Sequence, residues 1–539
     1  MFSFTKNLMN KKILFATFLS LYLVKNISAE GYIFNVTSYG AKADGITLDT
    51  KAIQSAINDA AVNGGRVVFP SGKYLSGTIF MRSNVTIELI EGAVLLGSTN
   101  ISDYPDTIPS LKSYNDVFLT QSLIYGENLH NISITGGGTI DGQGSAFKVT
   151  TRKKPDRYKK RPYVIRFIAC NNILIENISM KNSAMWMQQY LACENLTVRG
   201  INVYNHANQN NDMIDIDGCK NVIISDCFGD TDDDALTFKS TSGSINENIT
   251  VTNCVLSSHC NALKFGTETI GGFNNISISN IVIKPSVSKE KIYGLPGGIG
   301  GIVLSIVDGG IMDGITISNV RIDGVQTPIF LRLGNRGRTI REGMPKPSAG
   351  IMRNINISNI IANNVSSIGS SINGIPGHYI ENVSLNNISI QYSGGGNITD
   401  SSEVVPEKED QYPESNMFGK LPAYGFFIRH VEGLTLNNIS LNYKNDEKRP
   451  ALIFNDADNV NIYGLRGGID KEANSFIELV NTRNCFIYNS RALKPTKCFL
   501  YAKGKDTKNI NLTGNDYSAS NKMFEVSDGA DKESIIINH

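Results

Sequence analysis

A short unit, an asparagine followed by alternating β-forming residues, recurs along most of the chain. Central copies begin at Asn172, Asn195, Asn221, Asn248 and Asn275, which gives spacings of 23, 26, 27 and 27 residues. A repeat of this length is typical of a solenoid, because each unit is too short to bury a core alone. Apolar residues alternate with Ser, Thr or Asn, as in a half-buried strand. We therefore predict an all-β fold, a right-handed parallel β-helix with asparagines stacked at its corners.

One helix is expected, near the start of the chain. Asp49 to Ala61 places apolar residues at helical spacing after a capping-type aspartate, and the pattern stops at Gly64. Since the end of a solenoid must be covered, we expect this N-terminal helix to cap it. Residues 1–29 have the order of a secretory signal peptide, with an apolar run too short to cross a membrane. An uncleaved anchor is the alternative. We expect residues 30–539 to form one exported domain, periplasmic or extracellular.

The composition narrows the possible partners. The formal net charge is +1 and only 19% of residues are charged, so neither a nucleic-acid partner nor a membrane partner is expected. Five of the eight cysteines follow the repeat, at positions 170, 193 and 219 and at positions 227 and 254. This predicts a ladder of buried thiols, with disulfides between coils as the alternative. No Cys or His set has metal-site spacing, so we expect no metal and no cofactor. We expect a monomer.

Four stretches interrupt the repeat. Residues 284–313, 325–353 and 391–433 are rich in Gly, Pro, Ser and charged residues, so we expect loops that project from the solenoid and carry binding function. The fourth, residues 151–162, carries seven basic residues against one acid. It is either a solvated surface loop or a positive lip for a polyanionic substrate.

Two acidic motifs lie about one repeat apart. Asn210-Asn211-Asp212 is followed 21 residues later by Asp233-Asp234. Because this interval is close to one coil, we expect the acids to lie side by side on neighbouring coils. A corner or bulge in the backbone would aim Asp233 and Asp234 outward together. Solubilising surface acids are the alternative. Paired carboxylates held in this way are the groups that cleave glycosidic bonds.

With these motifs the chain resembles the polygalacturonase family of pectin-cleaving enzymes, glycoside hydrolase family 28. That family carries Asn-x-Asp, Asp-Asp, Gly-His-Gly and Arg-Ile-Lys motifs on one face of a right-handed β-helix. Further matches are Gly138 to Gly144, Arg161-Pro162, Asn182-Ser183 with Trp186, and Tyr39 to Ala61. The resemblance covers roughly residues 35–330. It implies that Asp233 is the general acid, that Asp212 and Asp234 hold and deprotonate the attacking water, and that hydrolysis inverts the anomeric configuration.

The later motifs depart from the family pattern. Gly-His-Gly is replaced by Ser258-His259-Cys260, and we expect His259 to lie near the acids, where it tunes the acid or contacts substrate. Lys239 and Lys264 fall at nearly equivalent positions on successive coils. They are expected to bind a sugar carboxylate together with Asn210, or else to neutralise the acids.

Arg-Ile-Lys is absent. Its place is taken by residues 301–310, which offer Asp308 where the family has two cations that bind a galacturonate carboxylate. We expect Asp308 to contact the substrate. Arg332, Arg336 and Arg338 follow on the next coil and are the candidates to replace the missing cations, because arginine binds carboxylates bidentately. The alternative is that these arginines are solvated.

Together these features predict a metal-independent, inverting glycoside hydrolase that acts on an anionic pectic polysaccharide. The favoured target is a terminal galacturonic acid of polygalacturonate or of rhamnogalacturonan-derived oligosaccharides, released in exo mode because the long loops close one end of the groove. The alternatives are hydrolysis of another pectic linkage on the same fold, a polysaccharide lyase, and a carbohydrate-binding β-helix without activity.

Overall fold

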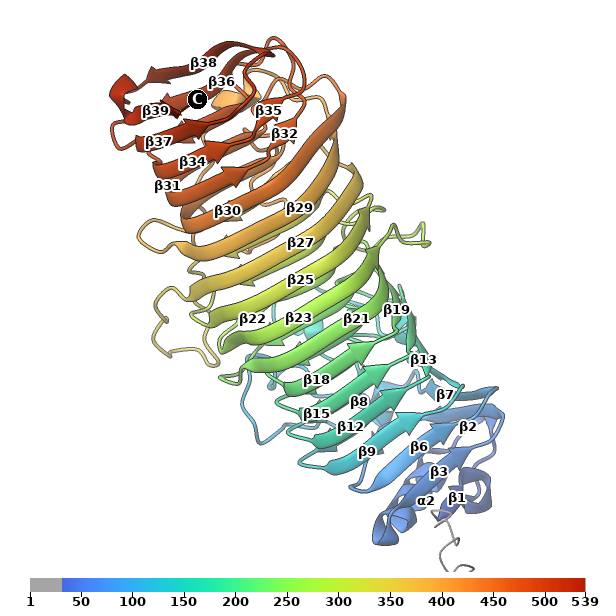
Figure 1. Cartoon of the computed structure of the whole chain (residues 1–539). Helices are drawn as coiled ribbons and strands as arrows, with labels where there is room; N and C mark the ends of the chain where they lie inside the picture. Colours follow the sequence, from blue (N-terminus) through green and yellow to red (C-terminus); the bar gives the residue numbers. More distant parts are fainter. Residues whose placement is uncertain (1–31, 539) are drawn as a thin grey trace, which may run out of the picture.

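The chain winds into an elongated parallel β-helix whose coils stack along one axis (Figure 1). The computed structural model describes residues 32–538, so the predicted signal peptide lies outside the described residues. Neighbouring coils pair in parallel and in register. Ile173, for example, lies between Ile132 of the preceding coil and Leu196 of the next. The predicted fold class is confirmed.

The strands form three ladders along the axis. The first ladder, which starts at each asparagine corner, contains β1 (Ile33–Asn35), β3 (Gly65–Phe69), β6 (Val85–Leu89), β9 (His130–Thr135), β12 (Asn171–Glu176), β15 (Glu194–Arg199), β18 (Lys220–Ser225), β21 (Asn246–Ser258), β23 (Gly272–Ile283), β25 (Ile311–Asp323), β27 (Ile351–Val365), β29 (Ile380–Gly394), β30 (Phe426–Asn445), β31 (Leu452–Tyr463), β34 (Arg483–Tyr488), β37 (Lys508–Thr513) and β39 (Ile535–Asn538).

The second ladder follows the first around each coil. It contains β2 (Asp44–Leu48), β4 (Gly72–Ser76), β7 (Ala93–Gly97), β10 (Thr139–Asp141), β13 (Ser179–Lys181), β16 (Asn202–Asn205), β19 (Phe228–Thr231), β32 (Arg466–Gly467) and β35 (Arg491–Ala492). From β21 to β30 the long strands of the first ladder continue into this position, as the pairing of β19 with the end of β21 shows.

The third ladder completes each coil, and the long loops precede or follow its strands. It contains β5 (Ile79–Phe80), β8 (Ser122–Glu127), β11 (Tyr163–Ile168), β14 (Gln188–Leu191), β17 (Ile214–Asp217), β20 (Leu236–Ser240), β22 (Asn261–Thr269), β24 (Gly300–Ile306), β26 (Thr327–Leu333), β28 (Ser370–Asn373), β33 (Ile477–Val480), β36 (Thr496–Lys503) and β38 (Ser520–Ser527). The starts of β30 and β31 join it between β28 and β33.

The repeated asparagines occupy left-handed corners. Asn172, Asn221, Asn248 and Asn275 have φ angles of 56°, 55°, 57° and 52°. Asparagine tolerates this conformation better than most residues. The side-chain amide of Asn248 donates to Asn221 (3.2 Å), and that of Asn275 donates to Asn248 (2.8 Å). The predicted asparagine stack therefore satisfies its own amides from coil to coil.

Helix α2 (Thr50–Asn63) lies at the amino end of the solenoid (Figure 1). Its buried face consists of Ile53, Ala56, Ile57 and Ala60, which join the first coils of the core. The predicted capping helix is therefore present. The carboxylate of its N-cap residue Asp49 does not cap the helix, because it accepts from the backbone amides of Lys42 and Ala43. The short 3₁₀ helices are η1 (Val36–Tyr39), η2 (Ile101–Asp103), η3 (Gly144–Ala146), η4 (Asp156–Tyr158), η5 (Asp400–Ser402) and η6 (Lys532–Ser534).

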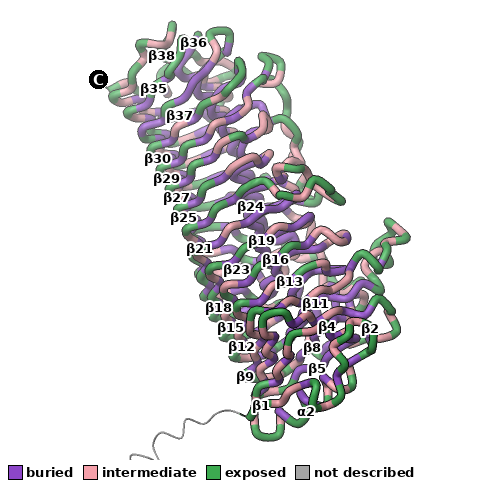
Figure 2. The backbone as a smooth tube through the Cα atoms, turned by 90° about the vertical axis from the view of Figure 1, so that its right-hand side faces the viewer, coloured by how far each residue is buried: buried purple, intermediate pink, exposed green. Residues whose placement is uncertain are grey.

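Buried and more exposed residues alternate along many strands of the first ladder, whereas strands of the third ladder such as β11 and β17 are buried throughout (Figure 2). In β6, for example, Val85, Ile87 and Leu89 are buried, whereas Thr86 and Glu88 are partly exposed. The cysteines are buried free thiols, as the thiol-ladder prediction requires. Within residues 32–538, none of the helices has the length and apolarity needed to cross a membrane.

Candidate active site

The two acidic motifs lie in turns between the second and third ladders. Asp212 follows β16 and precedes β17, while Asp233 and Asp234 lie between β19 and β20. The turns belong to neighbouring coils, because the amide of Met213 donates to the carbonyl of Asp234 (3.0 Å). The predicted side-by-side placement is therefore observed.

The turn after β19 separates three consecutive aspartates. Asp233 and Asp234 line a cavity, whereas Asp232 lies behind it and accepts backbone hydrogen bonds from Ile292 (2.6 Å) and Tyr293 (2.7 Å). The backbone turn therefore aims two adjacent acids to the same side, which a regular strand does not allow.

The cavity above these turns has a volume of about 360 Å³. This lies near the lower end of the range of small-ligand pockets, about 300–1,000 Å³. Six aromatic side chains contribute to its walls: Tyr114, Phe118, Tyr158, Trp186, Tyr293 and Tyr412. Flat aromatic walls beside a few convergent polar groups suit a ligand with both apolar and polar faces, such as a sugar.

Each stretch that interrupts the repeat contributes to the walls. Residues 151–162 supply Lys154, and residues 284–299 supply Tyr293. Residues 334–350 supply Arg338, and residues 395–425 supply Tyr412. The three later loops are shorter than the predicted stretches 284–313, 325–353 and 391–433, because strands such as β24 and β26 lie within those bounds. Residues from all four stretches nevertheless line one cavity.

Asp233 is held by its neighbours. Its backbone amide donates to Asn211 (3.0 Å), and its carboxylate accepts from the side-chain amide of Asn210 (3.3 Å) and the backbone amide of Asp234 (3.0 Å). Burial, followed by the charge of Asp234, raises the pKa of Asp233 to about 7. A carboxyl group with this pKa is about half protonated at neutral pH, so it can supply the proton that a general acid requires.

Asp212 and Asp234 lie in different environments. Both oxygens of Asp234 are engaged, by Lys264 (2.9 Å) and by the side-chain amide of Asn261 (2.8 Å). Asp212 has Lys239 at 3.5 Å from Oδ2, while its Oδ1 is buried with no hydrogen-bond partner among the described residues. Burial and the neighbouring carboxylates raise the pKa of Asp212, and the ammonium of Lys239 opposes this rise. Its free oxygen is available to a water molecule in the cavity.

The two lysines differ in position. Lys239 lines the cavity, with its ammonium 4.5 Å from the centre of the Trp186 ring. Lys264 pairs in register with Thr237, two residues before Lys239, so the two lysines are not equivalent on successive coils. Lys264 is buried behind Asp234. This geometry favours the neutralising alternative for Lys264.

Asp308, Arg332 and Arg336 do not line the cavity. Arg336 forms a bidentate ion pair with Asp308 (3.0 and 2.6 Å), so each of the two charges is already paired within the protein. Arg332 is buried and donates to the carbonyl groups of Glu407 (2.7 Å) and Lys408 (3.1 Å). Buried carbonyl groups need hydrogen-bond donors. Arg332 supplies them to the 395–425 loop and does not make the expected substrate contact.

Besides Lys239, the cations that line the cavity are Lys154, Arg157 and Arg338. Arg338 pairs with Glu268, and although burial opposes it, Lys239 and Arg338 lower the pKa of Glu268 to about 2. Lys154 and Arg157 have no carboxylate within ion-pair distance in the described part of the chain. Burial and the charges of Arg338 and Arg157 lower the pKa of Lys154. This cluster of cations favours an anionic ligand.

His259 is fully buried and lies outside the cavity wall. Its Nδ1 is 2.8 Å from Oδ1 of Asp232. The neighbouring Cys260 lines the cavity in its place. His259 is therefore not placed to contact a substrate in the cavity, and it pairs with Asp232, the neighbour of Asp233.

A cavity with clustered carboxylates, one of which has a pKa raised to about 7, is the arrangement that glycoside hydrolases use. The chain belongs to the family described as Glycosyl hydrolases family 28, which residues 65–410 match.

Individual relatives agree with this assignment. A probable polygalacturonase of Vitis vinifera is 27% identical over 437 residues, which are 75% of this chain and 86% of that protein. An exo-poly-α-D-galacturonosidase of Dickeya chrysanthemi is 42% identical over 120 residues, 21% of this chain and 20% of that protein. The solved family 28 exopolygalacturonase of Yersinia enterocolitica has the same fold, with a TM-score of 0.62 at 21% identity, over 80% of this chain and 79% of that chain.

Proposed function

We propose that this protein is an exo-acting, inverting hydrolase that removes a galacturonic acid residue from the end of a pectic chain. The observation that carries the proposal is the position of two cations without acidic partners, Lys154 and Arg157, in the cavity that holds the three aspartates. The relatives named polygalacturonase and exo-poly-α-D-galacturonosidase support the choice of sugar.

In the proposed reaction Asp233 donates its proton to the leaving oxygen of the glycosidic bond. A water molecule held by the free Oδ1 of Asp212 and by Asp234 attacks the anomeric carbon from the opposite face and loses a proton to Asp212. The leaving chain departs as a neutral hydroxyl, and the released sugar has the inverted configuration. Lys239 opposes the rise in the pKa of Asp212, and Lys264 forms an ion pair with Asp234 (2.9 Å).

This role for Asp233 predicts a pH profile. Because the pKa of Asp233 is raised to about 7, the proton needed by the leaving group is present below that pH and is lost above it. We expect kcat/KM to fall about tenfold per pH unit above about 7. A profile of kcat/KM between pH 4 and pH 10, roughly, measures this limb. A rate that stays constant well into the alkaline range contradicts the assignment of Asp233 as the acid.

The small volume of the cavity supports exo action. Four loops from distant parts of the sequence contribute to its walls, and the volume fits a short stretch of sugar chain. A polymer that is cleaved internally must extend beyond the site in both directions. A chain end, in contrast, needs to extend from the site in one direction only.

Uronate recognition predicts a second result. We expect an oligosaccharide with a terminal galacturonate to react about 10 to 100 times faster, as kcat/KM, than its carboxyl-reduced counterpart, because charge-assisted hydrogen bonds contribute about 1.5–3 kcal/mol. Lys154→Met should remove most of this preference. Lys148→Met is the matched control, since Lys148 is exposed in the same loop and outside the cavity.

Two outcomes separate the alternatives. Equal rates on both oligosaccharides favour hydrolysis of a neutral pectic sugar on the same fold. An unsaturated product that absorbs in the ultraviolet indicates a lyase. Since polysaccharides do not enter cells intact, the proposed function also requires export, for which residues 1–29 are the expected signal. We propose that the exported chain acts as a monomer and one catalytic domain.

A further inference from the structure

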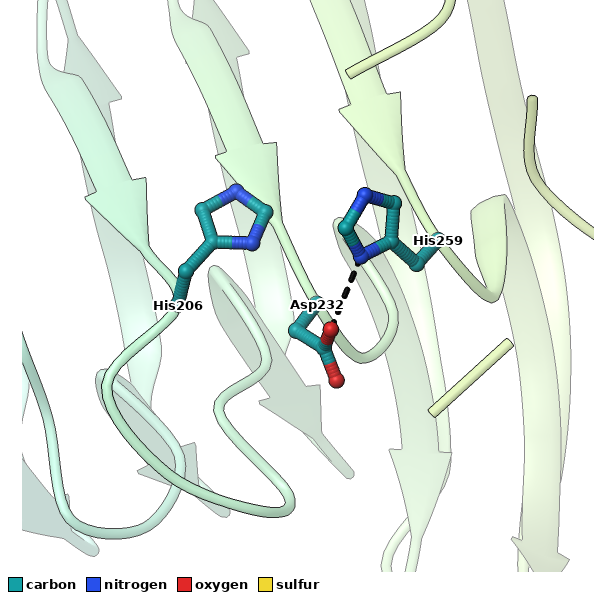
Figure 3. A group of neighbouring side chains, drawn as sticks. All are labelled: His206, Asp232 and His259. Atoms are coloured by element: carbon teal, nitrogen blue, oxygen red, sulfur yellow. Dashed lines mark hydrogen bonds and ion pairs between the residues drawn. The ribbon is translucent and has the colours of Figure 1, made fainter. Parts of the chain in front are cut away.

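Two histidines and an aspartate converge beside the turn that carries Asp233 (Figure 3), and none of the three lines the catalytic cavity. His206 follows β16, Asp232 follows β19 and His259 follows β21, so the three residues come from successive coils. One potential ligand atom from each residue lies within 4.8 Å of the others. Their side chains are only 6%, 0% and 1% exposed.

The Nε2 atom of each histidine faces a hydrogen-bond acceptor. Nε2 of His206 is 3.0 Å from the carboxylate of Asp230, and Nε2 of His259 is 3.2 Å from the carbonyl of Ser288. For His206 this acceptor favours the tautomer with its proton on Nε2, which leaves a lone pair on Nδ1. In His259 both ring nitrogens face acceptors, so a metal ion would take the place of the proton between Nδ1 and Asp232. Histidines that bind metal ions are oriented in this way, by a carboxylate or carbonyl on the other ring nitrogen.

The other ring nitrogen of His206, Nδ1, is buried and has no hydrogen-bond partner among residues 32–538. The ring of His206 lies 5.1 Å from that of His259, centre to centre. In His259, Nδ1 is 2.8 Å from Oδ1 of Asp232. A buried nitrogen without a partner carries a cost that a cation between these groups would remove.

We propose that His206, Asp232 and His259 bind a divalent transition metal ion, with Zn²⁺ as the best match. Two imidazole nitrogens and one carboxylate oxygen form a ligand set that Zn²⁺ accepts in its tetrahedral coordination, with water as the fourth ligand. A neighbouring cleft lined by Tyr204, His206, Ser288 and Glu290 provides a path for the ion.

The ion would fix a loop and take no part in hydrolysis. Asp232 accepts the backbone amides of Ile292 and Tyr293, and His259 holds the carbonyl of Ser288, so the site joins the 284–299 loop to the β-helix. Tyr293 of this loop lines the catalytic cavity. The inference goes beyond the proposed function, because its ligands are not the catalytic acids.

Zinc titration of the untagged, chelator-treated protein by calorimetry tests the proposal. We expect one saturable site per chain. His206→Gln should weaken zinc binding at least tenfold, because the glutamine amide can still donate to Asp230 but offers no ring nitrogen. His130→Gln, at an exposed histidine of β9, is the matched control and should bind zinc like the wild type.

A second measurement does not depend on a variant. Cobalt-loaded wild-type protein should show visible absorption without the near-ultraviolet band of a cobalt–thiolate bond, because the proposed ligands include no cysteine. Absence of saturable zinc binding to the wild type, unchanged binding by His206→Gln, or a cobalt–thiolate band would each overturn the proposal. None of these results depends on hydrolytic activity, so the outcome is independent of the proposed function.

Discussion

Asp233→Asn is expected to lower kcat by about 10²- to 10⁴-fold, because an amide cannot donate the proton that the leaving sugar needs. The side chain keeps its size, and its surroundings are hydrogen-bonded through Asn210 and Asn211. We therefore expect the fold and KM to change little. Steady-state kinetics on a pectic oligosaccharide, together with circular dichroism, measure both effects.

Asp226→Asn is the matched control for this variant. Asp226 lies on the same coil at an exposed left-handed corner, a conformation that asparagine also adopts. Its activity should equal that of the wild type. If Asp233→Asn retained activity within tenfold of the wild type, Asp233 would not be the acid, and a carbohydrate-binding role would gain support.

Lys239→Met is expected to destabilise the protein by about 3–5 kcal/mol, because it leaves buried carboxylates without their cation. The ammonium of Lys239 lies 3.5 Å from Asp212, 3.4 Å from Asp215 and 3.9 Å from Glu268. The Lys239 side chain is only 6% exposed, so water does not replace it. Urea denaturation of the variant and the wild type measures the loss.

The control for this variant is Lys220→Met. Lys220 pairs with Glu247 at the surface, where an ion pair contributes less than about 1 kcal/mol. The destabilisation by Lys239→Met should also shrink as pH falls, because protonation removes the unpaired negative charges. Equal stabilities of the two variants at neutral pH would show that Lys239 does not balance the buried acids.

The regular part of the molecule could be predicted from the sequence. Asparagine corners and alternating strands recur at a fixed interval, so the spacing between Asp212 and Asp233 places these acids on adjacent coils. The local sequence pattern was sufficient for this prediction, because neighbouring coils pair in register. Residues that are one repeat apart in the sequence therefore lie next to each other in space.

The cavity walls could not be predicted residue by residue. Arg332 and Arg338 lie in one stretch of similar composition, yet Arg332 binds buried carbonyl groups and Arg338 lines the cavity. Tyr293 reaches the cavity because Asp232 holds its backbone amide. Such long-range contacts leave no periodic signal. The pairing of His206 with His259 was missed for the same reason, since neither residue belongs to a metal-binding spacing in the sequence.

The first products formed from an unbranched oligogalacturonide test the central claim most directly. Chromatography over the earliest time points should show free galacturonic acid and an oligomer shortened by one residue, with no intermediate sizes. A ladder of internal fragments before the monomer accumulates would contradict exo action by the cavity above Asp212, Asp233 and Asp234.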